Sequence, residues 1–212
     1  MKNSKRKANR LIETSFNLME LFTEIVKNSI VFWFYFIRGL GFLTILPAIE
    51  SLIFVSQDIL NNERIKTIKN FKNKYRNTNR KRFLSILTFF GLFYALIFFL
   101  TLVPKQYSGA FIYISKYITF IISMFVFLLV LTRPLLKTQF SKLNWSLLVH
   151  IFLLVREFWW TLMMIISLMV IVYLSFKNFI FLLFVFPGTS GLIVSFFTSK
   201  IIQNINYKYI EN

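Results

Sequence analysis

An arginine and a glutamate stand in an otherwise apolar stretch near the beginning of the chain. Residues 28–57 are mostly apolar, and Arg38 and Glu50 interrupt them on either side of Pro47. An arginine inside a bilayer costs several kcal/mol unless it is paired or hydrated, and a bend at the proline could bring the two charges together. We therefore predict an intramembrane polar pair. It lines a cavity or gates a path, or it only fixes a hairpin; alternatively, Arg38 reaches the interface because its span begins earlier.

A proline and two glycines interrupt the last apolar stretch of the chain. Pro187, Gly188 and Gly191 lie within residues 179–199. These residue types predict a break in a transmembrane helix, where freed backbone carbonyls can coordinate an ion. Close helix packing is the commoner reason for glycines three residues apart. Both interpretations stay open, and packing is favoured.

Residues 61–82 form the most basic part of the chain. Ile65, Ile68, Phe71 and Tyr75 recur there at spacings of three and four, which predicts a basic amphipathic helix. On the anionic inner leaflet, each basic residue close to the surface contributes about 1 kcal/mol. Because the chain is tethered to a bilayer, we favour lipid over nucleic acid as the partner, with docking of a cytoplasmic protein as the remaining alternative. The predicted anionic-lipid contacts are Lys66, Lys69, Lys72, Arg76, Arg80, Lys81 and Arg82.

The sequence lacks the signatures of catalysis and metal binding. It has no cysteine, one histidine and eight carboxylates, and no phosphate-binding glycine loop, HExxH or GxSxG motif. His150 and Glu157 share one face of an expected interfacial helix, where a histidine is usually a solvated or hydrogen-bonded surface group. Arg156 is expected to anchor the same helix at the interface. We therefore predict a protein that is not an enzyme, with no cofactor, metal site or catalytic residue.

The composition excludes an ordinary soluble domain. Of the 212 residues, 57% are apolar and 16% charged, whereas soluble domains carry about 25% charged residues. The mean hydropathy is +0.64, and several apolar stretches approach the roughly 20 residues that span a bilayer. We predict an all-α, polytopic membrane helical bundle with about six membrane segments and an N-terminal amphipathic helix, all in one integral membrane domain.

The expected segments begin with a basic tail and the amphipathic helix, which could also be the first turns of the first span. Residues 47–60 are short for a full crossing, so whether they cross or re-enter stays open. The segments are 1–27 (tail plus amphipathic helix), 28–60 (hairpin turning at Pro47), 61–82 (basic connector), 83–131 (hairpin), 132–157 (connector plus interfacial helix), 158–199 (hairpin) and 200–212 (tail).

The basic residues predict the orientation of the chain in the membrane. Six crossings put both tails and the two basic connectors on one side, and leave only Lys105 and Lys177 in the opposite turns. Basic segments stay in the cytoplasm, so both termini are expected there, in the cell membrane. Five crossings would translocate the basic N-terminal tail, against this bias.

One part of the chain resembles a known family. Residues 41–48, Gly-Phe-Leu-Thr-Ile-Leu-Pro-Ala, followed by Leu-Ile-Phe-Val at 52–55 and a basic connector, resemble the first hairpin of the YesL-like family of bacterial multi-pass membrane proteins. The spacing of the later apolar segments fits as well. Glu50, Asp58 and the more charged N-terminal region depart from the pattern, which puts the ends of the second segment in doubt.

The resemblance implies a plasma-membrane bundle with no established activity and no defined site residues, associated with carbohydrate uptake. Our first hypothesis is therefore a non-enzymatic accessory or scaffold component, with a carbohydrate permease as the membrane-protein partner. The alternative is a small-solute or ion transporter or channel that uses Arg38, Glu50 and the break at Pro187-Gly188.

Overall fold

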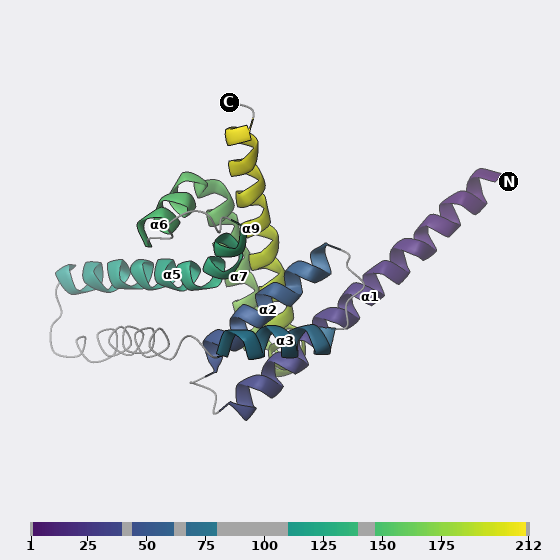
Figure 1. The fold of residues 1–212 in the computed structure, drawn as a ribbon, viewed down its shortest axis with the longest axis horizontal. Helices are drawn as coiled ribbons and strands as arrows, with labels where there is room; N and C mark the ends of the chain where they lie inside the picture. The colour runs from purple at the N-terminus through teal and green to yellow at the C-terminus, as the bar shows by residue number, and fades with distance from the viewer. Residues whose placement is uncertain (1, 40–43, 62–66, 80–109, 140–146, 211–212) are drawn as a thin grey trace.

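The described part of the protein is built from helices (Figure 1). The computed structural model describes residues 2–39, 44–61, 67–79, 110–139 and 147–210. Within these ranges the all-α prediction is confirmed. Residues 83–103, the uncharged first part of the hairpin expected at 83–131, lie outside the described residues, as do residues 140–144 of the expected connector.

The first helix begins well before the expected first span, which was to start at residue 28, and it ends before the expected bend at Pro47. α1 runs without interruption from Lys2 to Arg38, so the amphipathic segment and the first apolar stretch form one helix. α1 ends at Arg38 and α2 begins at Ile45, so Pro47 does not mark the end of the first helix as the sequence suggests. A Cβ atom on Gly39 would meet the Thr44 side chain at 2.0 Å, so residues 39 and 44 lie this close only because residue 39 has no side chain.

The second helix returns along the first. α2 spans Ile45–Leu60, and Pro47 is its third residue. The first four N–H groups of a helix have no partner within the helix, so a proline there removes no helical hydrogen bond. Pro47 therefore sits inside the beginning of α2 and does not break a span.

The short basic helix α3, Thr67–Asn79, packs on both α1 and α2. Phe71 is fully buried, and its ring stacks on Tyr35 of α1 at 5.4 Å between centroids. Tyr75 lies 4.6 Å from the same Tyr35 ring. The amphipathic helix predicted here exists, but its apolar residues at 71 and 75 face the protein, whereas Ile68 is exposed.

The second half of the chain begins with α5, Ala110–Gln139, which continues through Pro134 into the segment expected as a connector. α6, Leu147–Arg156, is the lead-in helix predicted from the sequence. Glu157 joins it to α7, Phe158–Lys177.

The predicted turn at Lys177–Asn178 is present. Asn178 caps α8, Phe179–Phe184, because its side-chain oxygen accepts hydrogen bonds from the N–H groups of Ile180 and Phe181 at 2.9 and 3.3 Å. α9, Phe186–Ile210, follows after Val185. The last apolar stretch is thus two helices, with the interruption just ahead of Pro187.

α9 is the centre of the arrangement and packs against α1, α2, α5 and α7 (Figure 1). α5 points away from α9 in this view and α1 crosses its lower part, so the helices do not all run alongside one another. Among the described residues, one helix, α7, is long and apolar enough to cross a membrane. The finer prediction of six spans is not confirmed.

α7 is buried along a single narrow stripe. Its buried residues, Thr161, Met164, Leu168 and Ser175, fall on one face, because they lie three, seven and fourteen residues from the first. The rest of the helix exposes large apolar side chains to its surroundings; among them are Trp159, Met163, Ile166, Met169, Val170, Val172, Tyr173, Leu174 and Phe176.

Candidate functional site

The interruption before α9 closes on α1 through one serine. The backbone N–H of Gly188 donates a 2.8 Å hydrogen bond to Oγ of Ser29. The Ser29 hydroxyl in turn donates to the carbonyl of Ile25 at 3.0 Å. A Cβ atom on Gly188 would lie 2.4 Å from that same carbonyl oxygen, so the two backbones touch only because residue 188 is a glycine. Pro187-Gly188 therefore begins a helix against α1.

The second glycine meets α2. A Cβ atom on Gly191 would lie 2.5 Å from Oγ of Ser56 and 3.1 Å from Cγ of Leu52. Asn28 of α1 donates a hydrogen bond from Nδ2 to the same Ser56 Oγ at 3.1 Å. Ser56 thus stands at the point where α1, α2 and α9 meet.

Two serines of α9, Ser195 and Ser199, extend the contact of α9 with α2. The Ser195 hydroxyl donates to the carbonyl of Ile53 at 2.9 Å, and the Ser199 hydroxyl donates to Oε1 of Gln57 at 3.1 Å. Residues 188, 191, 195 and 199 follow one another at helical spacing and place small side chains on one face. We call this contact of α1, α2 and α9, made by Asn28, Ser29, Ser56, Gly188, Gly191 and Ser195, the three-helix junction.

The junction is buried and tightly packed. Asn28, Ser29, Ser56 and Ser195 each have no exposed surface. Neither glycine leaves space for one added carbon atom. Small residues that let helices approach closely, with serine and asparagine hydrogen-bonding across the contact, are the usual interface of helices packed in a bilayer. Of the two interpretations that the sequence left open for this motif, the contacts favour packing.

Arg38 and Glu50 lie in different surroundings. Arg38 is the exposed last residue of α1, whereas Glu50 is buried within α2. Asn28 reaches the Leu52 carbonyl at 3.5 Å, and Thr44 reaches the Phe36 carbonyl at 3.4 Å, which together fix the register of the hairpin. This register sets Glu50 level with the part of α1 about eight residues before Arg38, or about 12 Å along the helix axis. The polar pair stays a prediction.

Three of the side chains predicted to contact anionic lipid lie in the described part of the basic helix, and all three are exposed. Lys69, Lys72 and Arg76 are exposed on α3. Lys66, Arg80, Lys81 and Arg82 lie outside the described residues. Because α3 packs along α1 and α2 through Phe71, only its outer face is free to meet a lipid surface.

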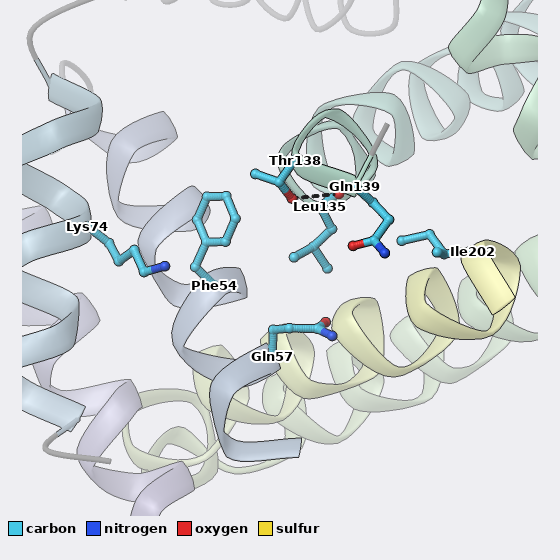
Figure 2. Close-up of a pocket in the computed structure, with 7 residues that line it drawn as sticks. All are labelled: Phe54, Gln57, Lys74, Leu135, Thr138, Gln139 and Ile202. Atoms are coloured by element: carbon cyan, nitrogen blue, oxygen red, sulfur yellow. Dashed lines mark hydrogen bonds between the residues drawn. The ribbon is translucent and has the colours of Figure 1, made fainter. Parts of the chain in front are cut away.

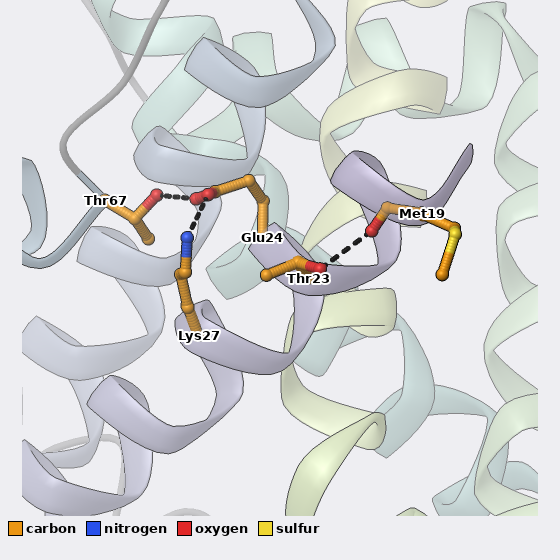
Figure 3. A network of polar contacts seen from close by, with 5 residues as sticks. All are labelled: Met19, Thr23, Glu24, Lys27 and Thr67. Atoms are coloured by element: carbon orange, nitrogen blue, oxygen red, sulfur yellow. Dashed lines mark hydrogen bonds and ion pairs between the residues drawn. The ribbon is translucent and has the colours of Figure 1, made fainter. Parts of the chain in front are cut away.

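A small polar network fixes the start of α3 to α1 (Figure 3). The carboxylate of Glu24 accepts a hydrogen bond from the Thr67 hydroxyl through one oxygen and forms an ion pair with Lys27 at 2.7 Å through the other. Glu24 lies in the segment 1–27, for which the sequence predicts an amphipathic helix with a polar face that includes this residue. This face is thus partly used to hold the connector, which sequence reasoning missed.

His150 is buried, although we expected a surface group. Its Nε2 atom lies 2.8 Å from the hydroxyl oxygen of Thr132 on α5. That hydroxyl donates its single hydrogen to the carbonyl of Leu128 at 2.8 Å, so Nε2 of His150 must be the donor in their contact. Burial, together with the positive charge of Arg133, lowers the pKa of His150 to about 4. The histidine is therefore neutral at pH 7 and joins α6 to α5.

Glu157 is likewise inside the protein. Oε2 of Glu157 accepts a hydrogen bond of 2.5 Å from Nδ2 of Asn204 on α9, and Oε1 lies 4.0 Å from Nε of Arg156. The sequence placed Glu157 and Arg156 at the interface but gave no sign of the asparagine 47 residues away. The contact ties the α6–α7 corner to the end of α9.

The described residues hold no cluster of three or more His, Cys, Asp or Glu side chains that could bind a metal ion. No family model, no curated protein and no solved structure matches the chain. The similarity to the YesL-like family stays a prediction. The arrangement defines an all-helical protein whose polar side chains, in the parts described, link helices to one another.

Proposed function

We propose that this chain is an integral protein of the cell membrane, multi-pass and with both termini in the cytoplasm. The apolar surface of α7 supports this, because a helix of its hydropathy in a soluble protein would be mostly buried, and this one is mostly exposed. The basic connectors support the orientation through the bias of Lys and Arg toward the cytoplasm.

The distribution of polar residues supports the same environment. The fully buried positions of α1, α2 and α9 include Asn28, Ser51, Ser56, Ser195 and Thr198. Phe and Ile side chains are exposed elsewhere on α1 and α7, and Phe196 is exposed on α9. Small and polar residues between helices, with large apolar residues outside, suit a surrounding of lipid tails and would be unfavourable in water.

Within that membrane class, we propose a non-enzymatic accessory or scaffold component. The observation that carries the proposal is the packed three-helix junction, because the one motif that could have opened an ion site in α9 is filled by Ser29 and Ser56. The resemblance to the YesL-like family adds carbohydrate uptake as the process and a carbohydrate permease as the membrane-protein partner. Anionic inner-leaflet lipids are the other partner.

The test is crosslinking of the tagged chain in living cells, followed by capture in mild detergent and identification of partners. A tagged membrane protein of similar abundance is the control. We expect permease subunits to be enriched with this chain, and deletion of its gene to slow uptake of the corresponding labelled sugar. Equal recovery of permease subunits with the control, or unchanged uptake, contradicts the proposal.

A small-solute or ion transporter is the second candidate, favoured by Glu50. A buried carboxylate in a membrane segment is by default a functional hypothesis, and this one is 7% exposed. Flux through liposomes that contain only the purified chain separates the two proposals. Saturable flux that Glu50→Gln abolishes supports transport and rules out a purely accessory role, whereas no flux from folded protein rules out transport.

A further inference from the structure

The cavity of about 220 Å³ among α2, α3, α5 and α9 does not form a single polar site (Figure 2). The ammonium group of Lys74 lies 4.9 Å from the centre of the Phe54 ring. Figure 2 shows this ammonium group across the ring from the amide groups of Gln57 and Gln139. The polar groups of the cavity therefore do not converge on one ligand.

The outer side of α7 carries a stripe of exposed residues that runs the length of the helix. Its members recur at spacings of four and three, which places them on one face, opposite the buried stripe of the same helix. We call the following residues the outer stripe: Trp159, Met163, Ile166, Val170, Tyr173 and Lys177. All six are exposed, and the first five range from 47% at Ile166 to 72% at Trp159.

The two ends of the outer stripe differ from its middle. Trp159 and Tyr173 each carry a polar atom on an aromatic ring, and Lys177 carries a charge, whereas the three residues between the rings are apolar. Tryptophan and tyrosine are enriched where a membrane meets water, because one part of each side chain is apolar and the other is wet. The order along the stripe matches the section of a bilayer, in which hydrocarbon lies between two interfaces.

The length of the stripe fits the same surroundings. Trp159 lies about 21 Å from Tyr173 and about 27 Å from Lys177 along the helix axis. The hydrocarbon core of a bilayer is roughly 30 Å thick, and that of thinner membranes about 27 Å. The ammonium group of Lys177 lies 5.7 Å from the centre of the Tyr173 ring, so the charge and the ring mark one boundary.

The turn between α7 and α8 is flanked by exposed apolar side chains. Phe176 is 87% exposed, Phe179 70% and Ile180 68%, and α8 has no buried residue. A cluster of such side chains is unfavourable in water. Asn178 accepts hydrogen bonds from the first N–H groups of α8, as an environment poor in water requires. The tip of this hairpin is thus suited to lipid and not to bulk water.

We propose that the outer stripe and the α7–α8 tip form a lipid-facing surface, with acyl chains against Met163, Ile166 and Val170. Lipid head groups lie at Trp159 and at Lys177, where the ammonium group meets the negative phosphates. The turn after α7 stays at the level of the outer head groups and does not project into water. The proposal rests on the proposed function, because it requires the chain to lie in a membrane, and it adds which residues meet each layer. A second copy of the chain is the competing occupant of this face.

The test is a depth scan of the purified full chain in liposomes of phosphatidylglycerol and phosphatidylcholine. The single variants Met163→Cys, Ile166→Cys, Val170→Cys and Lys177→Cys each carry a nitroxide, and the chain has no cysteine that would add background. Oxygen collides with the label in hydrocarbon, and a water-soluble nickel complex collides with it in water. We expect the ratio of oxygen to nickel collisions to be greatest between residues 163 and 170 and lowest at 177. Met164→Cys, on the buried stripe, is the matched control and should show few collisions with either reagent.

The outcomes separate this proposal from the proposed function. Frequent nickel collisions at all four positions would place the stripe in water and contradict both. Few collisions with either reagent at Ile166 and Val170 would show that protein covers the stripe, which leaves the membrane assignment standing and overturns this proposal. Spin–spin broadening in that case assigns the cover to a second copy. Phe179→Cys tests the tip separately: we expect more oxygen than nickel collisions, and the reverse would place the turn in water and overturn its part of the proposal.

Discussion

Gly188 of α9 and Ser29 of α1 join the last helix to the first. The N–H of Gly188 donates a 2.8 Å hydrogen bond to the Ser29 hydroxyl, across 159 positions of sequence. The same glycine brings its backbone against the Ile25 carbonyl. The contact explains why the proline-glycine segment does not leave an open break. It also makes the first helix and the last helix parts of one packed unit.

Gly188→Ala should be the most damaging single methyl addition at the junction. The new Cβ atom would lie 2.4 Å from a backbone oxygen, which cannot rotate away. We expect a loss of about 3 kcal/mol in the free energy of unfolding, at the upper end of the cost of overpacking. Thermal unfolding in mild detergent measures it, and a melting temperature equal to that of the wild type would show that the two backbones are not in contact.

Gly191→Ala should cost less, about 1–2 kcal/mol, because its closest neighbour is a side-chain atom, Oγ of Ser56. Removing that atom tests the contact directly. In the double variant Gly191→Ala, Ser56→Ala, the two losses should be less than additive, as they are for residues that touch. Strictly additive losses in the same unfolding assay would mean that residues 191 and 56 do not meet.

Phe71→Ala should detach the basic helix from the hairpin. The ring is fully buried and stacks on Tyr35, so its loss should lower stability by about 3–5 kcal/mol. Ile68→Ala is the matched control on the same helix, because Ile68 is 63% exposed and should change stability by less than about 0.5 kcal/mol. Limited proteolysis of α3 should increase in the first variant only. Equal effects of the two changes would place α3 flat on the membrane.

His150 should make stability fall in mild acid. The unfolded chain binds a proton on this residue near pH 6.5, and the folded protein binds it only near pH 4, so lower pH favours unfolding between these values. We expect an unchanged melting temperature above pH 6.5 and a loss approaching roughly 3 kcal/mol at pH 4. His150→Gln should remove this part of the pH dependence. A wild-type curve with the same slope as the variant would show that the histidine is exposed.

The sequence predicted the helical class and several boundaries, because these depend on local features. The turn at Lys177–Asn178 follows from two polar residues between apolar runs, and the amphipathic α3 follows from the spacing of Phe71 and Tyr75. The prediction of a turn at Pro47 was wrong, because a proline is tolerated in the first turn of a helix. Pro47 therefore marks the beginning of α2 and not the end of α1.

The contacts between distant helices could not be predicted from local patterns. The partners of Gly188, His150 and Glu157 lie on other helices, and their separation in the sequence carries no signal of the contact. One signal was present: the small residues at 188, 191, 195 and 199 share a helical face, which is typical of a face that packs closely on another helix. That pattern predicts that this face of α9 packs against another helix, but it does not identify the partner helix.

Thiol accessibility in intact cells tests the central claim, a packed junction inside a membrane protein, most directly. The chain has no cysteine, so single replacements of Ser29, Ser56 and Ser195 report without background, and Lys72→Cys is the exposed control. We predict that a small water-soluble maleimide labels residue 72 in permeabilised cells and leaves the three junction cysteines unlabelled until the protein is denatured. Labelling of residue 56 or 195 in the folded protein would reveal a water-filled path and contradict the account.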